Sequence, residues 1–174
     1  SRPYDAKGLL ISSIRDPDPV IFFEPKRVYR AIKEDVPENE YLIPIGKANI
    51  LHGGDDLTLI TYGSWVRDAL NIANESKYSI DLIDLRTLKP LDIDLIIKSV
   101  SRTGRCVIVH EAPKTLGLAS EIIALINEKA LLSLEAPIVR VTGFDTVVPL
   151  PKLEANYMPN KERIESAIEK VMKF

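Results

Sequence analysis

Residues 80–97 have the pattern of a buried strand, a polar turn and an amphipathic helix in direct succession. Apolar residues fill most of positions 80–85, which is typical of a short buried strand. Pro90 ends the extended part, and Asp92 is a predicted N-cap of the helix that follows. In that helix the apolar residues recur three and four positions apart, at Ile93, Ile96, Ile97 and Val100. A strand–helix unit of this kind is typical of parallel sheets, so the chain is predicted to have an α/β fold.

The same alternation continues along the chain from Leu57 onward. Strands are predicted at 57–62, 80–85, 106–109 and 138–141, and helices at 65–74, 93–103, 118–132 and 161–172. Ser64 and Asn160 are predicted N-caps, and Gly104 is a predicted helix end. Pro149 and Pro151 mark a long irregular crossing. This order predicts a mostly parallel open sheet with helices on both faces.

The N-terminal part differs in pattern from the rest. Residues 5–14 have helical spacing, and Val20–Phe23 is predicted to be a short apolar strand. Residues 26–46 are charged and irregular, which is typical of a linker. We therefore predict a remnant of a preceding domain at 1–25, a linker at 26–46 and a main domain at 47–174. The absence of an initiator methionine at Ser1 leads us to expect a processed chain or a fragment.

The composition is that of an ordinary globular protein, with a net charge of −2 and 45% hydrophobic residues. The near balance of charge argues against a dedicated nucleic-acid binder. No apolar run has the length of a membrane span, and no signal peptide opens the sequence. The single Cys106 is interpreted as a small buried residue, which is consistent with a reducing compartment. With only His52 and His110 beside it as soft ligands, a structural zinc site is not expected.

Candidate catalytic residues are few. The sequence has no GxGxxG or GxxxxGK[ST] loop, and Tyr62-Gly63-Ser64 has only half of a nucleophile elbow. His110 is the one weak catalytic candidate, as a general acid–base group with Asp84 or Arg86 on a neighbouring strand. Glu111 would point to the opposite face of the strand. We favour the alternative that His110 is hydrogen-bonded at a domain contact.

Two further groups of polar residues are candidates for binding. Asp84, Arg86, Thr87 and Lys89 follow a strand at the edge where open α/β sheets bind ligands. Asp16 and Asp18 flank Pro17 in a tight turn, where two carboxylates and backbone carbonyls can bind a hard cation. An ordinary solvated turn is the alternative for this second group.

Several short segments of the sequence resemble segments of one enzyme family. These are DAKGLL, RDPDPVIFFEPKRVYRA, IDLIDLRTLKPLD, RTGR followed by VIVHEAP, SLEAPIVRVTG and the final VMKF. Together they resemble the beta subunit of the thiamine-diphosphate-dependent decarboxylase component of 2-oxo acid dehydrogenase complexes, in its pyruvate and branched-chain forms. The resemblance is nearly continuous from Tyr4 to Phe174, and it implies the carboxyl-terminal transketolase-like domain of that subunit. Transketolases share this fold but not all of these segments.

The resemblance implies a function that is shared among several chains. The parent enzyme carries out oxidative decarboxylation of a 2-oxo acid with acyl transfer to lipoyl groups. Its thiamine diphosphate is held by an earlier domain of the beta subunit and by the alpha subunit, so we expect neither cofactor binding nor catalysis from this chain alone. The implied partners are the alpha subunit, a second beta subunit and the subunit-binding domain of the dihydrolipoyl acyltransferase. The implied location is the cytoplasm, or the mitochondrial matrix in a eukaryote.

The resemblance also implies roles for particular residues. Ser13, Asp16 and Asp18 match a structural potassium site, although Asp18 replaces an asparagine of relatives. Glu135 and the terminal carboxylate of Phe174 match positions that face the basic subunit-binding domain, which an acidic pair would attract. The alternative for Glu135 is a solvated loop residue. A non-catalytic α/β interaction module and a transketolase-like enzyme fragment are the alternative functions.

Overall fold

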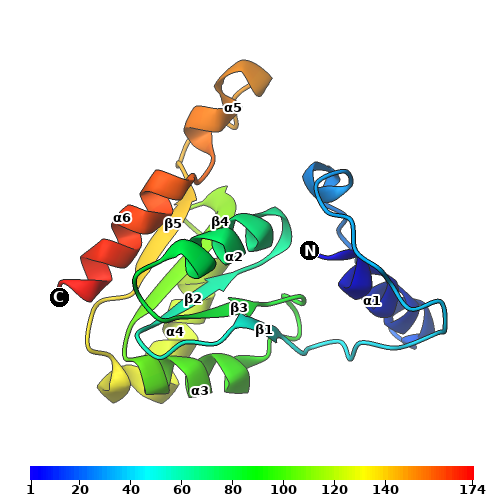
Figure 1. Cartoon of the computed structure of the whole chain (residues 1–174), viewed down its shortest axis with the longest axis horizontal. Helices are drawn as coiled ribbons and strands as arrows, with labels where there is room; N and C mark the ends of the chain where they lie inside the picture. Colours follow the sequence, from blue (N-terminus) through cyan, green and yellow to red (C-terminus); the bar gives the residue numbers. More distant parts are fainter.

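The main body is a five-stranded sheet with helices on both faces, in a computed structural model that describes residues 1–174 (Figure 1). The strands lie in the order β1-β3-β2-β4-β5, with β1 antiparallel to β3 and the other neighbours parallel. This confirms the predicted mostly parallel α/β sheet. The strands are β1 (Asn49–His52), β2 (Leu57–Thr61), β3 (Ile80–Asp84), β4 (Cys106–Pro113) and β5 (Val139–Gly143).

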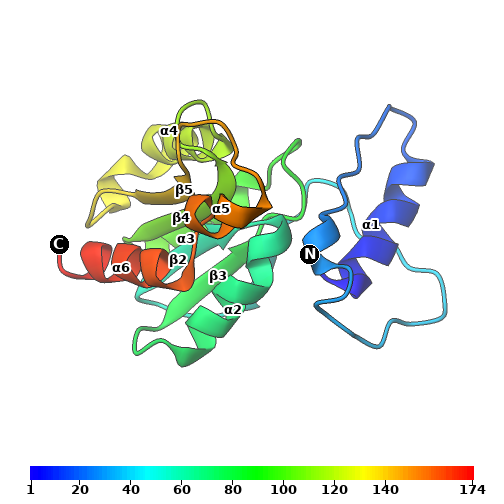
Figure 2. The same cartoon turned by 90° about the horizontal axis from the view of Figure 1, so that it is seen from above.

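Two pairs of helices cover the two faces of the sheet and form two separate apolar cores (Figures 1 and 2). Helices α2 (Val66–Glu75) and α6 (Lys161–Met172) cover one face, and α3 (Ile93–Thr103) and α4 (Leu118–Ala130) cover the other. Neighbouring strand residues divide between the cores, because successive side chains point to opposite faces. Leu82 belongs to the first core and Ile83 to the second. No helix is long and apolar enough to cross a membrane.

Two predicted helix ends are confirmed. The Asn160 side chain accepts a hydrogen bond from the Arg163 backbone N–H at 2.9 Å, so it caps α6. Gly104 ends α3 with φ +67°, a left-handed conformation that glycine adopts without strain.

Two predicted caps have different roles. Asp92 is at the N-cap position of α3, but its carboxylate accepts hydrogen bonds from the Ala48 N–H at 3.1 Å and from Lys47 Nζ at 3.4 Å. The prediction for Ser64 is wrong. Ser64 lies within the 3₁₀ turn η2 (Gly63–Trp65), and its hydroxyl donates to the Glu111 carboxylate. Both side chains therefore connect distant segments rather than cap a helix.

Residues 1–46, the N-terminal segment, lie beside the sheet (Figures 1 and 2). Helix α1 (Pro3–Arg15) packs against residues 41–43, where the Tyr4 and Tyr41 rings stack with centroids 4.4 Å apart. A single 3₁₀ turn, η1 (Lys26–Val28), follows. The predicted strand Val20–Phe23 is wrong, because these residues pair with no other strand and Ile21 and Phe23 are exposed.

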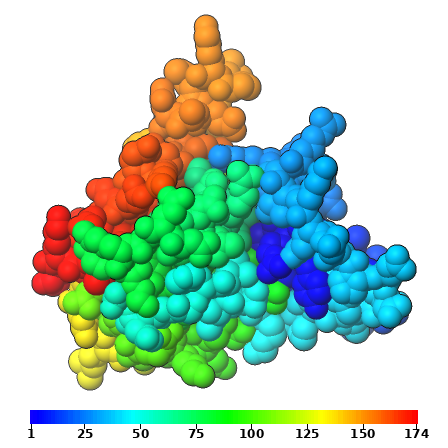
Figure 3. Space-filling model, in the orientation of Figure 1, coloured from blue at the N-terminus to red at the C-terminus, as the bar shows by residue number.

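Residues 144–157 form an arm that projects from the body (Figures 1 and 3). The sequence predicted an irregular crossing here, but the arm contains helix α5 (Pro151–Tyr157), with a proline in its first turn. Its inner end packs on the body through Tyr157, which is buried. The remaining element is a 3₁₀ turn at the end of α4, η3 (Leu131–Ser133).

Candidate partner-binding site

His110 is the only candidate for a catalytic residue, and the structure buries it. Its side chain, near the end of β4, is 1% exposed. The Ala119 N–H donates to His110 Nε2 at 3.4 Å, and Nδ1 has no hydrogen-bond partner. The expectation that Asp84 or Arg86 lies on a neighbouring strand is wrong, because β2 lies between β3 and β4. His110 is therefore surrounded by protein, and no acidic partner faces it.

The burial of His110 predicts a pH-dependent stability. Burial lowers the pKa of His110 below its ordinary value of 6.5; a backbone contact with Ala112 partly offsets this, and the nearby charge of Arg140 adds to the lowering. Between the lowered pKa and 6.5 the unfolded chain binds more protons than the folded one, so stability falls as the pH decreases through this window. We expect urea unfolding at pH 7 and pH 5.5 to show this loss, and a His110→Gln variant to show a smaller one. Equal losses in the two proteins would contradict the assignment.

The three residues of the implied potassium site lie at the end of α1 and in the turn after it, and no hydrogen bond joins Ser13 to the two aspartates. The Ser13 hydroxyl donates to the Leu9 carbonyl at 2.7 Å, and the Asp16 carboxylate accepts from the Asp18 N–H at 3.0 Å. No three His, Cys, Asp or Glu side chains gather in a way that could hold a metal ion. The potassium site stays a prediction from the resemblance.

The polar residues that follow β3 contact the N-terminal segment. Arg86 Nη2 lies 2.5 Å from Asp5 Oδ1 of α1, and the Thr87 hydroxyl accepts from the Gly46 N–H at 3.1 Å. Asp84 is buried, and burial raises the pKa of its carboxyl group. The predicted binding edge is therefore occupied, at β3, by another part of the same chain.

Glu135 and Phe174, far apart in the sequence, line one groove of about 440 Å³. The groove lies beside α4 and η3, and Glu135 is the one lining residue with a charged side chain. The Phe174 ring is 77% exposed. The walls are mostly apolar, with the complete set being Ile123, Asn127, Leu131, Leu134, Glu135, Ala136, Pro137, Ile138 and Phe174. An apolar groove with a carboxylate at its side can bind an apolar group that carries a positive charge.

Glu135 is held in place by the turn between α3 and β4. Its carboxylate lies 2.5 Å from Arg105 Nη1, and its backbone N–H donates to the Gly104 carbonyl at 2.8 Å. Its side chain also covers Gly104, where an added Cβ would lie 2.7 Å from Glu135 Cγ. The Glu135 side chain stays 59% exposed despite these contacts. Arg105 could not be predicted, because an arginine after a helix-ending glycine has no sequence pattern that identifies its partner.

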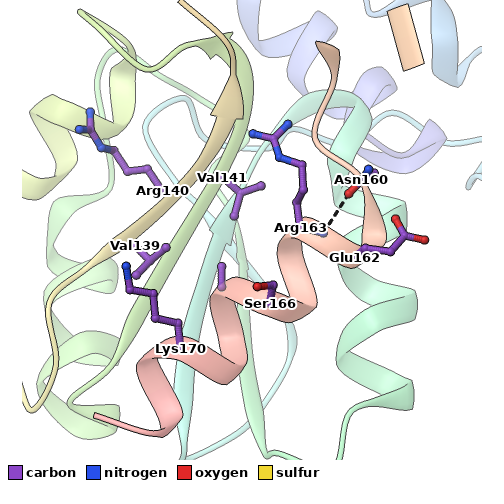
Figure 4. Close-up of a pocket in the computed structure, with 9 residues that line it drawn as sticks. Val139, Arg140, Val141, Asn160, Glu162, Arg163, Ser166 and Lys170 are labelled. Atoms are coloured by element: carbon purple, nitrogen blue, oxygen red, sulfur yellow. Dashed lines mark hydrogen bonds between the residues drawn. The ribbon is translucent and has the colours of Figure 1, made fainter. Parts of the chain in front are cut away.

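A second groove, of about 550 Å³, lies between α6 and β5 (Figure 4). One of its cationic residues, Arg163, donates to the Thr142 carbonyl at 2.6 Å and to the Met158 carbonyl at 3.0 Å. The same guanidinium lies 4.5 Å from the centroid of the Phe144 ring. Arg163 therefore fastens the arm to the body, and its hydrogen bonds are used within the chain.

Comparisons with known proteins agree with this architecture. A model of the transketolase C-terminal domain family matches residues 46–164. Over its whole length the chain is 49% identical to subunit beta of the pyruvate dehydrogenase E1 component of Bacillus subtilis (strain 168), and 47% identical to that of Staphylococcus aureus (strain Mu50). The chain covers 54% of each relative, so it spans about half of their length. A split-gene transketolase, solved as an inactive beta4 tetramer, shares the fold, with a TM-score of 0.67 and 23% identity over 76% of this chain and 44% of that one.

Proposed function

Because the chain belongs to the transketolase C-terminal domain family, we propose that it is the carboxyl-terminal part of the beta subunit of a 2-oxo acid dehydrogenase of the pyruvate type. The match of the whole of this chain to about half of the length of pyruvate dehydrogenase beta subunits carries this proposal. The parent enzyme would decarboxylate the 2-oxo acid oxidatively and transfer the acyl group to lipoyl groups. It would act in the cytoplasm, or in the mitochondrial matrix of a eukaryote.

In this proposal thiamine diphosphate is held outside these 174 residues. One feature supports this: open α/β sheets bind cofactors at the carboxyl ends of their strands. At the end of β3, that edge is filled by Asp5 and Arg86. The role of this region is then assembly: contacts with the alpha subunit and a second beta subunit, and docking of the acyltransferase.

The arm supports a role in subunit contacts. The segment projects from the molecule (Figure 3), and it carries four exposed apolar side chains: Val147, Val148, Leu150 and Leu153. Exposed apolar clusters of this kind are typical of surfaces that a partner covers. We assign the arm to contacts within the proposed heterotetramer.

The activity is tested by expressing the complete beta polypeptide that contains this sequence together with its alpha subunit. We expect pyruvate-dependent reduction of an artificial electron acceptor that requires added thiamine diphosphate, and no turnover from the 174-residue chain. A complete complex without turnover would contradict the enzyme assignment and favour a non-catalytic interaction module.

The docking role predicts an effect of Glu135→Ala. The groove of Glu135 and Phe174 would bind the basic subunit-binding domain of the acyltransferase, and Glu135 would attract it by its charge. Because Glu135 is largely exposed, we expect its loss to weaken binding only about fivefold. Isothermal titration of the chain with the docking domain measures this change. Glu121→Ala, which removes the same charge from an exposed site of α4 outside the groove, is the control and should bind normally. Unchanged affinity of Glu135→Ala would refute the assignment of this residue.

A further inference from the structure

We propose that Arg86 is a positioning residue that fixes the orientation of the N-terminal segment on the sheet. The residues matched by the family model begin at residue 46, so Asp5 lies outside the matched domain and Arg86 lies inside it. Their ion pair therefore joins two parts of the chain. Asp5 is fully buried and the Arg86 side chain is 13% exposed, with 2.5 Å between Oδ1 and Nη2.

The ion pair is suited to orientation rather than to stability. Taking two charges out of water costs about as much as their attraction returns, so a buried pair adds little net stability. Here the compensation is incomplete, because Asp5 Oδ2 and Arg86 Nε are buried without hydrogen-bond partners. The pair is nevertheless directional, because the two groups must meet in one geometry to avoid a larger cost.

The backbone of Arg86 is held in an unusual conformation that supports this role. Its φ is +55°, in the left-handed region that L-residues other than glycine seldom adopt because of steric strain. The Arg86 N–H donates to Asp84 Oδ1 at 3.1 Å, which holds the conformation. Backbone strain of this kind persists where the surrounding structure requires one particular side-chain direction.

Two further polar contacts join the N-terminal segment to the same end of β3: the Ser1 hydroxyl donates to the buried Asp84 carboxylate, and the Gly46 N–H donates to the Thr87 hydroxyl at 3.1 Å. Neither is an ion pair, and the remaining contacts are more exposed.

The Arg27 guanidinium lies 4.7 Å from the centroid of the Trp65 ring and 3.8 Å from Asp68, and its side chain is largely exposed. Within the segment, α1 is joined to residues 41–43 by the tyrosine stack and by a hydrogen bond from the Ile43 N–H to the Gly8 carbonyl at 3.3 Å. The segment is therefore one unit, and Asp5–Arg86 is its only buried ion pair with the body.

The orientation can be measured with two spin labels on the 174-residue chain. Ile14→Cys on α1 and Lys98→Cys on α3 are exposed sites on the two parts. Cys106 is fully buried, and burial raises the pKa of its thiol, so it should not react with the label. We expect a single narrow distance distribution in the labelled protein.

The Asp5→Leu/Arg86→Met variant separates orientation from stability. Apolar replacement of both charges should keep the urea midpoint, because no unpaired charge is left. The width of the distance distribution should at least double. An unchanged width would overturn the proposal. If the double variant fails to fold, Arg86→Lys gives the same test, since lysine keeps the charge but loses the planar geometry of the guanidinium. Arg27→Ala is the control, and broadening in it equal to that of the double variant would also overturn the proposal.

The consequence for catalysis rests on the proposed function. In the complete enzyme the segment would lead to the thiamine-binding domain, so the double variant should lose turnover while the subunits still assemble. If the complex without any substitution shows no turnover, the proposed function is contradicted, but the role of Arg86 is not. The distance measurement on this chain would still decide the role of Arg86.

Discussion

The Asp81→Ala variant is expected to lose about 2 kcal/mol of unfolding free energy. Asp81 is 1% exposed and accepts hydrogen bonds from the Ser99 hydroxyl and from Arg102 Nη2, the latter at 2.6 Å. Ser99 in turn lies 2.7 Å from the Thr58 hydroxyl. Removing the carboxylate leaves the buried Ser99 hydroxyl without this acceptor, which is costly, and it removes one partner of Arg102, whose side chain is 41% exposed. Urea unfolding followed by the fluorescence of Trp65 measures the change.

Asp55 provides a matched control, because it binds the same arginine from the surface. Its carboxylate contacts Arg102 Nη1, but its side chain is 81% exposed. Surface ion pairs contribute little, so Asp55→Ala should behave as an ordinary surface substitution. Similar losses in the two variants would show that the charge on Arg102, rather than the burial of Asp81, determines the effect.

The Gly54→Ala variant should be destabilised by about 2–3 kcal/mol. A Cβ on Gly54 would lie 2.4 Å from backbone atoms of Ser79 and Ile80, at the start of β3. Backbone atoms cannot move aside as a flexible side chain can, so the turn before β2 must shift. Thermal and urea unfolding report the loss.

Gly53 is the control for this substitution. An added Cβ there meets nothing within 4 Å, and the residue does not have a positive φ. Gly53→Ala should be neutral or slightly stabilising, because alanine reduces the freedom of the unfolded chain. A loss in Gly53→Ala equal to that in Gly54→Ala would show that the flexibility of the turn, and not the close approach, is important.

Periodic segments were predicted correctly because their own residues determine them. The spacing of apolar residues in Ile80–Ile97 determines β3 and α3, and four of the five strands and the long helices fall near the predicted places. Val20–Phe23 has the same apolar content as a strand, but a strand requires a neighbour to pair with. Ser64 has the residue type of an N-cap, but the helix is preceded by the 3₁₀ turn η2, which already includes Ser64, and the Ser64 hydroxyl donates to Glu111 on β4.

The candidate groove could not be predicted from the sequence, because it is formed by residues that are far apart in the chain. The resemblance selected Glu135 and Phe174 separately, and only the packing of α6 beside the loop after η3 brings them together. Only the structure shows that Arg105 forms an ion pair with Glu135. Similarly, the binding edge predicted after β3 depended on a general rule for open sheets, and the N-terminal segment occupies it instead.

The position of β1 has a consequence for the order in which the chain folds. During synthesis β1 emerges first of the strands, but its sheet neighbour is β3 and not β2, which follows it directly. Residues 49–52 therefore have no partner until residue 84 has left the ribosome. The parallel pair β2–β3, joined through α2, can form without β1. The antiparallel edge is thus added to a pair that already exists, and a nascent chain stalled before β3 should leave Asn49–His52 accessible to proteases.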